Sequence, residues 1–180
     1  MTVADMQSRA SMAEAFEVSR FLYDEAQLLD DMEWDAWLSC YHPDTLYWAP
    51  VRENRVYRER KFETYPRGTS AHFEETHIFL QQRVHRLKSQ KAWAEEPASR
   101  SRHAVSNVRV DRTEDPGAYS VRSNFLVYRT RGERDQDLVA GERRDRIVRA
   151  PEAPYGFLIQ ERQVLFDMAT ILVKNLSLFY

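Results

Sequence analysis

Two histidines and two carboxylates stand within the six residues from His72 to His77, and such a cluster could hold a metal ion. If this segment is helical, five steps of about 100° place the two imidazoles roughly 140° apart around the axis. A zinc-binding pair on a helix instead follows the H-E-x-x-H pattern, which keeps both histidines on one face. We therefore expect exposed histidines beside carboxylates near a helix start, and no metal site.

The sequence has one cysteine, Cys40, and lacks the glycine-rich G-x-G-x-x-G and G-x-x-x-x-G-K patterns. Those patterns hold dinucleotides and phosphates against a helix start. A Rieske cluster needs two cysteines and two histidines, and other iron–sulfur clusters need four thiolates. We therefore expect no cofactor in this chain, and we interpret Cys40 as a small core residue in a reducing compartment.

General acid–base chemistry is a further possibility, because several ionisable side chains could line a cavity between helices and a curved sheet. The candidates are Asp30, Asp31, Tyr41, His42, Tyr47 and His103. A histidine beside a buried carboxylate would be a competent base. Nothing in the sequence pairs a particular aspartate with a particular histidine, so no catalytic residue is assigned. A stand-alone dehydratase or isomerase stays an alternative, as does a ligand-binding dimerisation module.

Arginine supplies nearly all of the basic charge, since lysine occurs only at positions 61, 88, 91 and 174. Arginine forms bidentate pairs and tolerates desolvation, which suits buried ion pairs and interfaces, although a GC-rich genome would give the same bias. Arginine is concentrated in two segments, Trp93–Val108 and Gly141–Arg149. Each segment is either solvated or in contact with a partner. The candidate interface residues are Arg100, Arg102, Arg143, Arg144, Arg146 and Arg149. In the first segment, Glu95 and Glu96 are possible acceptors within the chain.

The first half of the chain has the spacing of helices. Apolar residues recur every three or four positions from Ser11 to Leu29, which predicts a helix, and Glu33–Cys40 predicts a second, short one. Leu46–Val51 reads as a strand that Pro50 ends. The highly charged segment Arg52–Gly68 is expected to be a long loop. Helical spacing then returns from His72 to Leu87.

After Ser99 the period changes from 3.6 to 2, which indicates strands. The expected strands are His103–Arg112, Tyr119–Arg131, Leu138–Arg149, Phe157–Asp167 and Thr170–Phe179. Turn sequences such as Asp115-Pro116-Gly117 separate them. Helices first and antiparallel strands afterwards predict an α+β fold, with about three N-terminal helices packed on one curved antiparallel sheet.

The alternation in these strands is not clean. Arg122 and Asn124 share a face with Leu126, and charged residues occupy both faces of Leu138–Arg149. A sheet with one solvated face should be apolar inside and polar outside. Such a strand is expected either to twist out of the core or to meet a polar partner surface.

The composition is that of a globular protein, with 180 residues, 43% hydrophobic, 30% charged and a formal net charge of −2. We expect a single domain over residues 1–180. The small net charge gives no long-range attraction to nucleic acid or an anionic membrane. No apolar run approaches the roughly 20 residues that span a bilayer, and no secretory signal is visible. We therefore expect a cytoplasmic protein with neither nucleic-acid nor membrane partners.

Four motifs in a fixed order resemble the small (beta) subunit of Rieske-type aromatic-ring-hydroxylating dioxygenases. They are FLYDEAQLLD at 21–30 with Trp37-Leu38 and Tyr47-x-x-Pro50-x-Arg52, AEEPASRSRHAVSNV at 94–108, FLVYRTRGERDQDLVAGERRDRIVR at 125–149, and ILVKNLSLFY at 171–180. The sequence motifs PASRSRH and AGERRD, with AHFEE after Gly68, are most similar to the biphenyl, benzene and toluene branch. His72 and His77 have no role in this pattern.

The resemblance implies a nuclear-transport-factor-2-like cone fold, related to the cystatin-like folds. It implies a structural role in an α₃β₃ heterohexamer, in which the alpha subunit carries the Rieske 2Fe-2S cluster, the mononuclear non-haem iron and the substrate pocket. The whole complex would cis-dihydroxylate an arene with O₂ and with electrons from NADH through a ferredoxin and a reductase. No catalytic, cofactor-binding or metal-binding residue is carried over to this chain.

Overall fold

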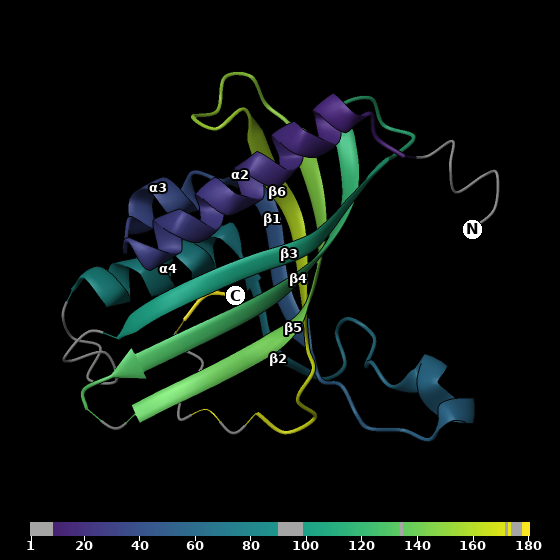
Figure 1. The fold of residues 1–180 in the computed structure, drawn as a ribbon, viewed down its shortest axis with the longest axis vertical. Coiled ribbons are helices and arrows are strands. Elements are labelled where there is room, and N and C mark those ends of the chain that lie inside the picture. The colour runs from purple at the N-terminus through teal and green to yellow at the C-terminus, as the bar shows by residue number, and fades with distance from the viewer. Residues whose placement is uncertain (1–8, 90–98, 134, 172, 174–177) are drawn as a thin grey trace.

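The computed structural model describes residues 9–89, 99–133, 135–171, 173 and 178–180. Within these residues, three α-helices and a 3-10 helix accompany one six-stranded sheet, drawn in Figure 1. The elements are α2 (Met12–Asp30), α3 (Trp34–Leu38), β1 (Tyr41–Pro50), η1 (Tyr57–Phe62), β2 (Ala71–Thr76), α4 (His77–Lys88), β3 (Arg100–Arg112), β4 (Ala118–Arg131), β5 (Asp135–Arg149) and β6 (Phe157–Phe166). The strand order is β2-β1-β6-β5-β4-β3.

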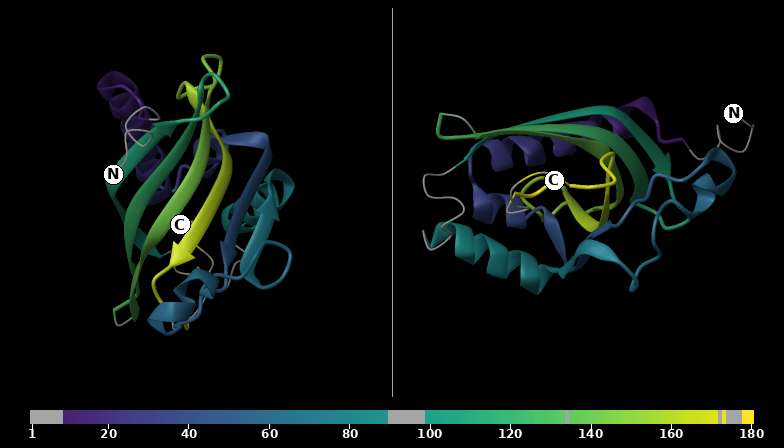
Figure 2. Two further views of the ribbon diagram at one scale, coloured as in Figure 1. Left: turned by 90° about the vertical axis from the view of Figure 1, so that its right-hand side faces the viewer. Right: turned by 90° about the horizontal axis from the view of Figure 1, so that it is seen from below.

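The sheet curves around its helices. Figures 1 and 2 show α2 and α3 within the curve, with α4 on the side of β1 and β2. Helix α2 packs against β3, and α4 packs against β1, β2 and α3. The buried side chains of these helices and of the concave face of the sheet form one core cluster. The expected α+β cone is therefore present, except that β1 runs parallel to β6 while every other pair is antiparallel.

The helix predicted from Ser11 begins with a capping box. The backbone N–H of Glu14 donates to the Ser11 hydroxyl, and the Ser11 backbone N–H donates to the Glu14 carboxylate. These two bonds satisfy backbone donors that a helix start otherwise leaves unpaired. The apolar stripe then lies in the core, and its buried members include Val18, Leu22 and Leu29. The prediction of this helix is confirmed.

Four of the five strands expected after Ser99 are confirmed, and their burial alternates. In β4 the side chains of Val121, Phe125 and Val127 are buried, while Arg122 and Asn124 are exposed. The same rule holds along β5, where alternate residues from 139 to 147 are buried. The charges on the inner face of β5 therefore neither twist away from the core nor reach a partner; they lie inside the cone.

The helix predicted from His72 to Leu87 is wrong in its first part. Ala71–Thr76 is an edge strand that pairs with β1, where Trp48 lies opposite Glu74, and the helix begins only at His77. The hydrogen bonds that hold β2 come from a strand over 20 residues earlier. A local pattern of apolar residues contains no information about such a distant partner.

The last predicted strand, Thr170–Phe179, is also wrong for the residues of it that the structure describes, since none of them is in a strand. Leu178, Phe179 and Tyr180 instead enter the concave interior, where at most 7% of each residue is exposed. We call these three residues the tail. Its backbone groups are paired with side chains of the core and not with a neighbouring strand.

The expected loop Arg52–Gly68 projects from the body, as Figure 1 shows at the lower right. We call residues 51–68 the arm. The base of the arm, at Arg52, is held in place, because Arg52 forms ion pairs with Glu63 at 3.0 Å and with Asp167 at 3.2 Å. Its tip is the 3-10 helix η1, which has no buried residue. The arm is thus ordered at its base while its tip leaves the core.

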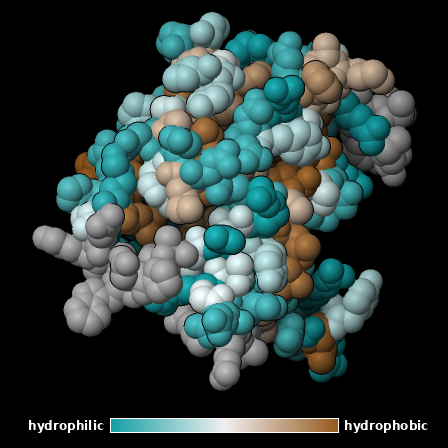
Figure 3. All heavy atoms as spheres, turned by 60° about the vertical axis from the view of Figure 1, so that its left-hand side comes forward, coloured by the Kyte–Doolittle hydropathy of each residue, from teal (hydrophilic) through white to brown (hydrophobic). Residues whose placement is uncertain are grey.

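Two surface properties complete the description of the fold. None of the described helices combines the length and the apolar character needed to cross a bilayer. On the face seen in Figure 3, hydrophilic side chains predominate and hydrophobic side chains appear between them.

Candidate functional site

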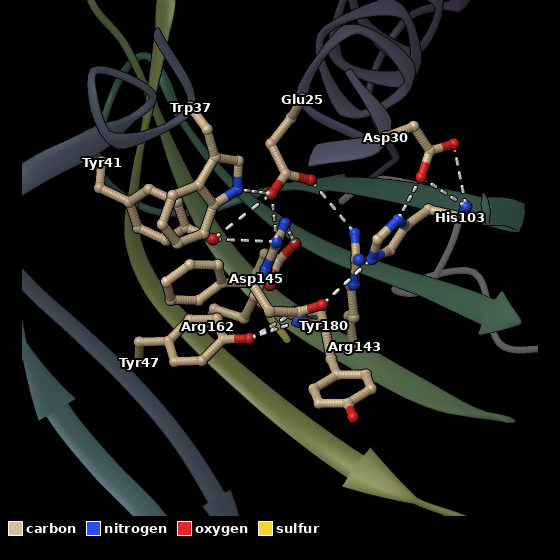
Figure 4. A network of polar contacts seen from close by, with 11 residues as sticks. Glu25, Asp30, Trp37, Tyr41, Tyr47, His103, Arg143, Asp145, Arg162 and Tyr180 are labelled. Carbon is tan, nitrogen blue, oxygen red and sulfur yellow. Dashed lines mark hydrogen bonds and ion pairs between the residues drawn. The ribbon is translucent and has the colours of Figure 1, made fainter. Parts of the chain in front are cut away.

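Asp30 and His103 form a hydrogen-bonded pair inside the cone (Figure 4). Asp30 is the last residue of α2, and His103 lies on β3. The distance from His103 Nδ1 to Asp30 Oδ1 is 2.6 Å, and the two side chains are 2% and 3% exposed. The backbone N–H of His103 also donates to this carboxylate. The tertiary structure therefore supplies the aspartate–histidine pair that the sequence could not assign.

The second ring nitrogen of His103 is occupied as well. His103 Nε2 lies 3.1 Å from the carbonyl oxygen of Phe179, so the imidazole bridges α2 and the tail. A general base must place a nitrogen within hydrogen-bond reach of a substrate proton. Because both nitrogens of His103 bond within the chain, the pair acts as a structural bridge in this arrangement.

Aromatic rings of the tail fill the space beside this bridge. The centroids of the Phe179 and Trp37 rings lie 4.0 Å apart. The guanidinium carbon of Arg83 lies 4.2 Å from the centroid of the Phe179 ring. The Tyr47 hydroxyl accepts a hydrogen bond of 2.7 Å from the Tyr180 backbone N–H and donates one of 2.8 Å to its carbonyl oxygen. The chain's own residues thus occupy the interior in which a cone-fold enzyme would hold a substrate.

A buried ionic cluster lies beside the tail, also shown in Figure 4. Its members are Glu25 from α2, Arg143 and Asp145 from β5, and Arg162 from β6. None of the four is more than 4% exposed. Two carboxylates face two guanidinium groups, so their formal charges cancel. Buried charges need such compensation, because the cost of removing an unpaired ion from water is several kcal/mol or more.

Glu25 is the centre of this cluster. Its Oε1 accepts hydrogen bonds from Trp37 Nε1 at 2.6 Å and from Arg162 Nη1 at 2.9 Å, and its Oε2 accepts one from Arg143 Nη1 at 3.2 Å. Burial alone would raise the pKa of Glu25, but the charges of Arg162 and Arg143 and these hydrogen bonds outweigh burial and lower it. Glu25 is therefore held as a carboxylate in the core.

Arg162 is held as a guanidinium cation. Burial alone would lower its pKa, but Asp145 and Glu25 raise it well above the ordinary value. The Tyr41 hydroxyl accepts a further hydrogen bond from Arg162 Nη1 at 3.0 Å. The cluster therefore joins α2, β1, β5 and β6 by hydrogen bonds in which at least one partner is charged, and such bonds are stronger than neutral ones.

Arg143 is the least satisfied member of the cluster. It is fully buried, yet its Nε and Nη2 have no hydrogen-bond partner among the described residues. Ser123 lies directly opposite on β4, and its buried hydroxyl is unpartnered as well. The sequence prediction placed Arg143 at an interface. The structure corrects this: its ion pair is made with Glu25 inside the same chain.

The other predicted interface arginines are at the surface. Arg102 is 68% exposed and contacts Asp30 at 3.2 Å, and Arg100 is exposed. Arg144 pairs with Glu142 at 2.5 Å and is 52% exposed. The remaining two bond within the chain, Arg146 to Asp115 and to Gln160, and Arg149 to Glu17 and to Tyr119. The possible acceptors Glu95 and Glu96 lie outside the described residues.

The remaining chemical candidates are separated from one another. Cys40 is 1% exposed and belongs to the core cluster, as predicted. His72 on β2 packs against Phe166, and His77 begins α4. Burial lowers the pKa of both histidines, which favours their neutral form. Within the described part of the chain, no three metal-ligating side chains converge.

Sequence reasoning missed Glu25, Asp145 and Arg162. A signal for Glu25 was available, because it lies three residues after Leu22 and four before Leu29, within the apolar stripe of the predicted helix. A carboxylate at such a position needs a buried cation. Which arginine supplies it could not be predicted, because the partners lie over 110 residues away.

A hollow lies on the outer face of the sheet and not in the cone. It is a groove of about 460 Å³ between the arm and strands β4 to β6. Its lining is rich in charge, with Arg52, Glu63, Glu142, Arg144 and Asp167 among its residues. Neither Asp30 nor His103 lines it. No described pocket therefore gives a substrate access to the aspartate–histidine pair.

The chain is similar to beta subunits of known dioxygenases. The chain is 42% identical to the benzene 1,2-dioxygenase subunit beta of Pseudomonas putida over 164 residues, which cover 91% of this chain and 87% of that protein. It is 40% identical, with the same coverage, to the biphenyl 2,3-dioxygenase subunit beta of Rhodococcus jostii (strain RHA1).

Two solved structures share the fold. A chain of naphthalene 1,2-dioxygenase with indole bound in the active site superposes with a TM-score of 0.82 at 23% identity, and the match covers 100% of this chain and 95% of that one. The beta subunit of the benzoate 1,2-dioxygenase from Burkholderia mallei gives 0.62 at 27% identity, covering 89% and 97%. The cone fold expected from the sequence is thereby confirmed.

The family described as "Ring hydroxylating beta subunit" matches residues 24–173. This match contains the ionic cluster, the aspartate–histidine pair and all strands of the sheet. A stand-alone dehydratase or isomerase, or a ligand-binding dimerisation module, is not favoured beside it. The chain belongs to the beta-subunit family of the aromatic-ring-hydroxylating dioxygenases.

Proposed function

We propose that this chain is the structural beta subunit of the terminal oxygenase of a multicomponent aromatic-ring dioxygenase. The observation that carries the proposal is the filled interior. Both nitrogens of His103 are bonded within the chain, and the rings of Phe179 and Tyr180 occupy the concave side of the sheet. A subunit with this interior contributes a rigid body with a defined surface.

The redox groups of such an enzyme belong to the alpha subunit in this proposal. A Rieske 2Fe-2S cluster needs two thiolates and two imidazoles. This chain offers one thiol, Cys40, which is buried, and burial raises its pKa far above its usual range. These donors do not fit a cluster. The mononuclear non-haem iron is likewise assigned to the alpha subunit, and no chemical step is assigned to residues of this chain.

The proposed assembly is an α₃β₃ hexamer in the cytoplasm that receives electrons from NADH through a ferredoxin and a reductase. The proposed reaction is the cis-dihydroxylation of an arene in aromatic hydrocarbon catabolism. The names of the relatives, which act on benzene and on biphenyl, support an arene of that type as the substrate. Arg100, Arg102, Arg144, Arg146 and Arg149 remain proposed as interface residues.

Purification with and without the large subunit tests this proposal. Alone, the chain is expected to be colourless, without stoichiometric iron and without oxygenase activity. Co-expressed with the large subunit, it is expected to co-purify in equal amounts and to give a brown, active complex. Stoichiometric iron with turnover in the isolated chain would overturn the structural role. Failure of the wild-type chain to co-purify would overturn the assembly.

A further inference from the structure

An exposed apolar patch lies on the outer face of the sheet, at the end where β3 and β5 begin and β4 ends. It consists of Ala104, Leu126, Tyr128, Leu138 and Ala140, and we call it the outer patch. Leu126, Tyr128 and Leu138 are 43%, 40% and 58% exposed. Single exposed apolar residues are ordinary, whereas a contiguous group of them marks a surface that binds another molecule.

The strand register makes these residues neighbours. Leu126 lies opposite Ala104 on one side and Ala140 on the other, and Tyr128 lies opposite Leu138. Side chains opposite each other on adjacent strands stand about 4.5–5.5 Å apart at Cβ. The five residues therefore form one continuous apolar surface two rows deep, on three strands of a rigid sheet.

The outer patch continues into the groove beneath the arm. Ala140 belongs to both the outer patch and the groove, and from there the groove runs between the sheet and the base of the arm at Arg52. The arm tip adds exposed side chains, because Val56, Tyr57 and Phe62 are 59%, 89% and 58% exposed. The outer patch, the charged groove and the arm thus form one surface with an apolar core and a polar rim, as protein interfaces have.

The charge around this surface is positive, although the whole chain carries a net charge of −2. The arm contains six basic and three acidic residues. On the same outer face of the sheet as the outer patch, Arg100 and Arg122 are exposed and form no ion pair with another described side chain, and Arg102 is 68% exposed. Two copies that met through the same surface would bring these arginines together, and such like-charge contacts disfavour association.

We propose that the outer patch, the groove and the arm form the docking surface for the large subunit of the oxygenase. The complementary surface presents apolar side chains to Leu126, Tyr128 and Leu138 and carboxylates to the surrounding arginines. The arm lies along the flank of the docked subunit and covers the edge of the contact. This inference rests on the proposed function, since it names the surface by which that function is performed.

The substitution Leu138→Asp tests the apolar centre. It places a charge at a side chain of the outer patch that is 58% exposed, so the isolated chain is expected to keep its thermal unfolding midpoint and circular dichroism. Phe16→Asp is the matched control, because Phe16 is 70% exposed on α2, and this helix lies within the curve of the sheet, on the face opposite the outer patch. When each variant is co-expressed with the large subunit, Leu138→Asp is expected to reduce co-purification at least tenfold and Phe16→Asp to leave it unchanged.

Charge reversal tests the rim separately. Arg122→Glu is expected to slow association with the large subunit at least tenfold at low salt, and the difference from wild type is expected to shrink as salt is added. An exposed arginine without an ion pair leaves the fold unaffected when it is replaced. Wild-type assembly by both Leu138→Asp and Arg122→Glu would overturn the inference while leaving the proposed function intact, because wild-type co-purification tests that function by itself.

Two other outcomes would also overturn the assignment of the occupant. One is an equal loss of assembly in Phe16→Asp and Leu138→Asp, because it would place the contact elsewhere. The other is found by light scattering on the isolated chain. If the wild type forms dimers or trimers that Leu138→Asp dissociates, a second copy of this chain occupies the surface instead of the large subunit.

Discussion

Asp145 and Arg162 lie directly opposite each other on β5 and β6, and the guanidinium of Arg162 donates hydrogen bonds of 3.0 and 2.9 Å to the two carboxylate oxygens. The third guanidinium nitrogen reaches Glu25 on α2. One side chain thus connects a cross-strand pair to the helix that covers the sheet.

Replacing Arg162 by methionine is expected to destabilise the chain by about 3–5 kcal/mol, because Glu25 and Asp145 would each lose a buried counter-charge. The measurement is the free energy of unfolding in urea. Arg144→Met is the control, since Arg144 is 52% exposed and exposed ion pairs contribute about 0–1 kcal/mol. Equal effects of the two substitutions would contradict the assignment of the cluster as a stabilising centre.

Acid is expected to weaken the fold through Glu25 and Glu14. The charges of Arg162 and Arg143 outweigh the effect of burial and lower the pKa of Glu25, while hydrogen bonds from Arg112 and Ser11 lower the pKa of Glu14 to about 2.

Because both folded-state pKa values lie below the usual 4.5, the unfolded chain takes up protons first as the pH falls. Their contribution is therefore complete above about pH 4.5 and is lost as the pH falls toward 2. Urea midpoints measured at pH 7, 4.5 and 3 are expected to be similar at the first two values and lower at the third. In Arg112→Gln the loss between pH 4.5 and 3 should be smaller, and a midpoint independent of pH would refute the prediction.

The Cys40 thiol is expected to resist modification in the folded protein. It is 1% exposed, and burial raises its pKa, so very little thiolate forms at pH 8. With Ellman's reagent at pH 8, the native chain should release no colour over the time in which the urea-unfolded chain reacts completely. Rapid reaction of the native chain would show that the core around Cys40 opens.

Phe179→Ala is expected to cost about 3–5 kcal/mol of stability, because it removes a buried ring that packs on Trp37 and lies beneath Arg83. Tryptophan fluorescence should change as well, since Trp37 loses its closest aromatic neighbour. Phe16→Ala, at a position 70% exposed, is expected to change stability by less than about 0.5 kcal/mol. Unaltered stability of Phe179→Ala would mean that the tail does not contribute to the folded core in solution.

The sequence by itself determined the elements whose signal is local. The helix beginning at Ser11 shows both a capping sequence and an apolar stripe, and the strands after Ser99 show period-two alternation with turn sequences between them. These patterns follow from the geometry of the chain over a few residues. The family also followed from motifs that can be read in order.

Only the tertiary structure decided the features that depend on distant partners. Ala71–Thr76 is a strand because β1 pairs with it, and the tail is irregular because Tyr47, Arg83 and His103 bind its backbone. Arg143 is a core residue because Glu25, 118 positions earlier, meets it across the cone. Electrostatic and hydrogen-bond partners are chosen by proximity in space, and proximity in space is a property of the whole fold.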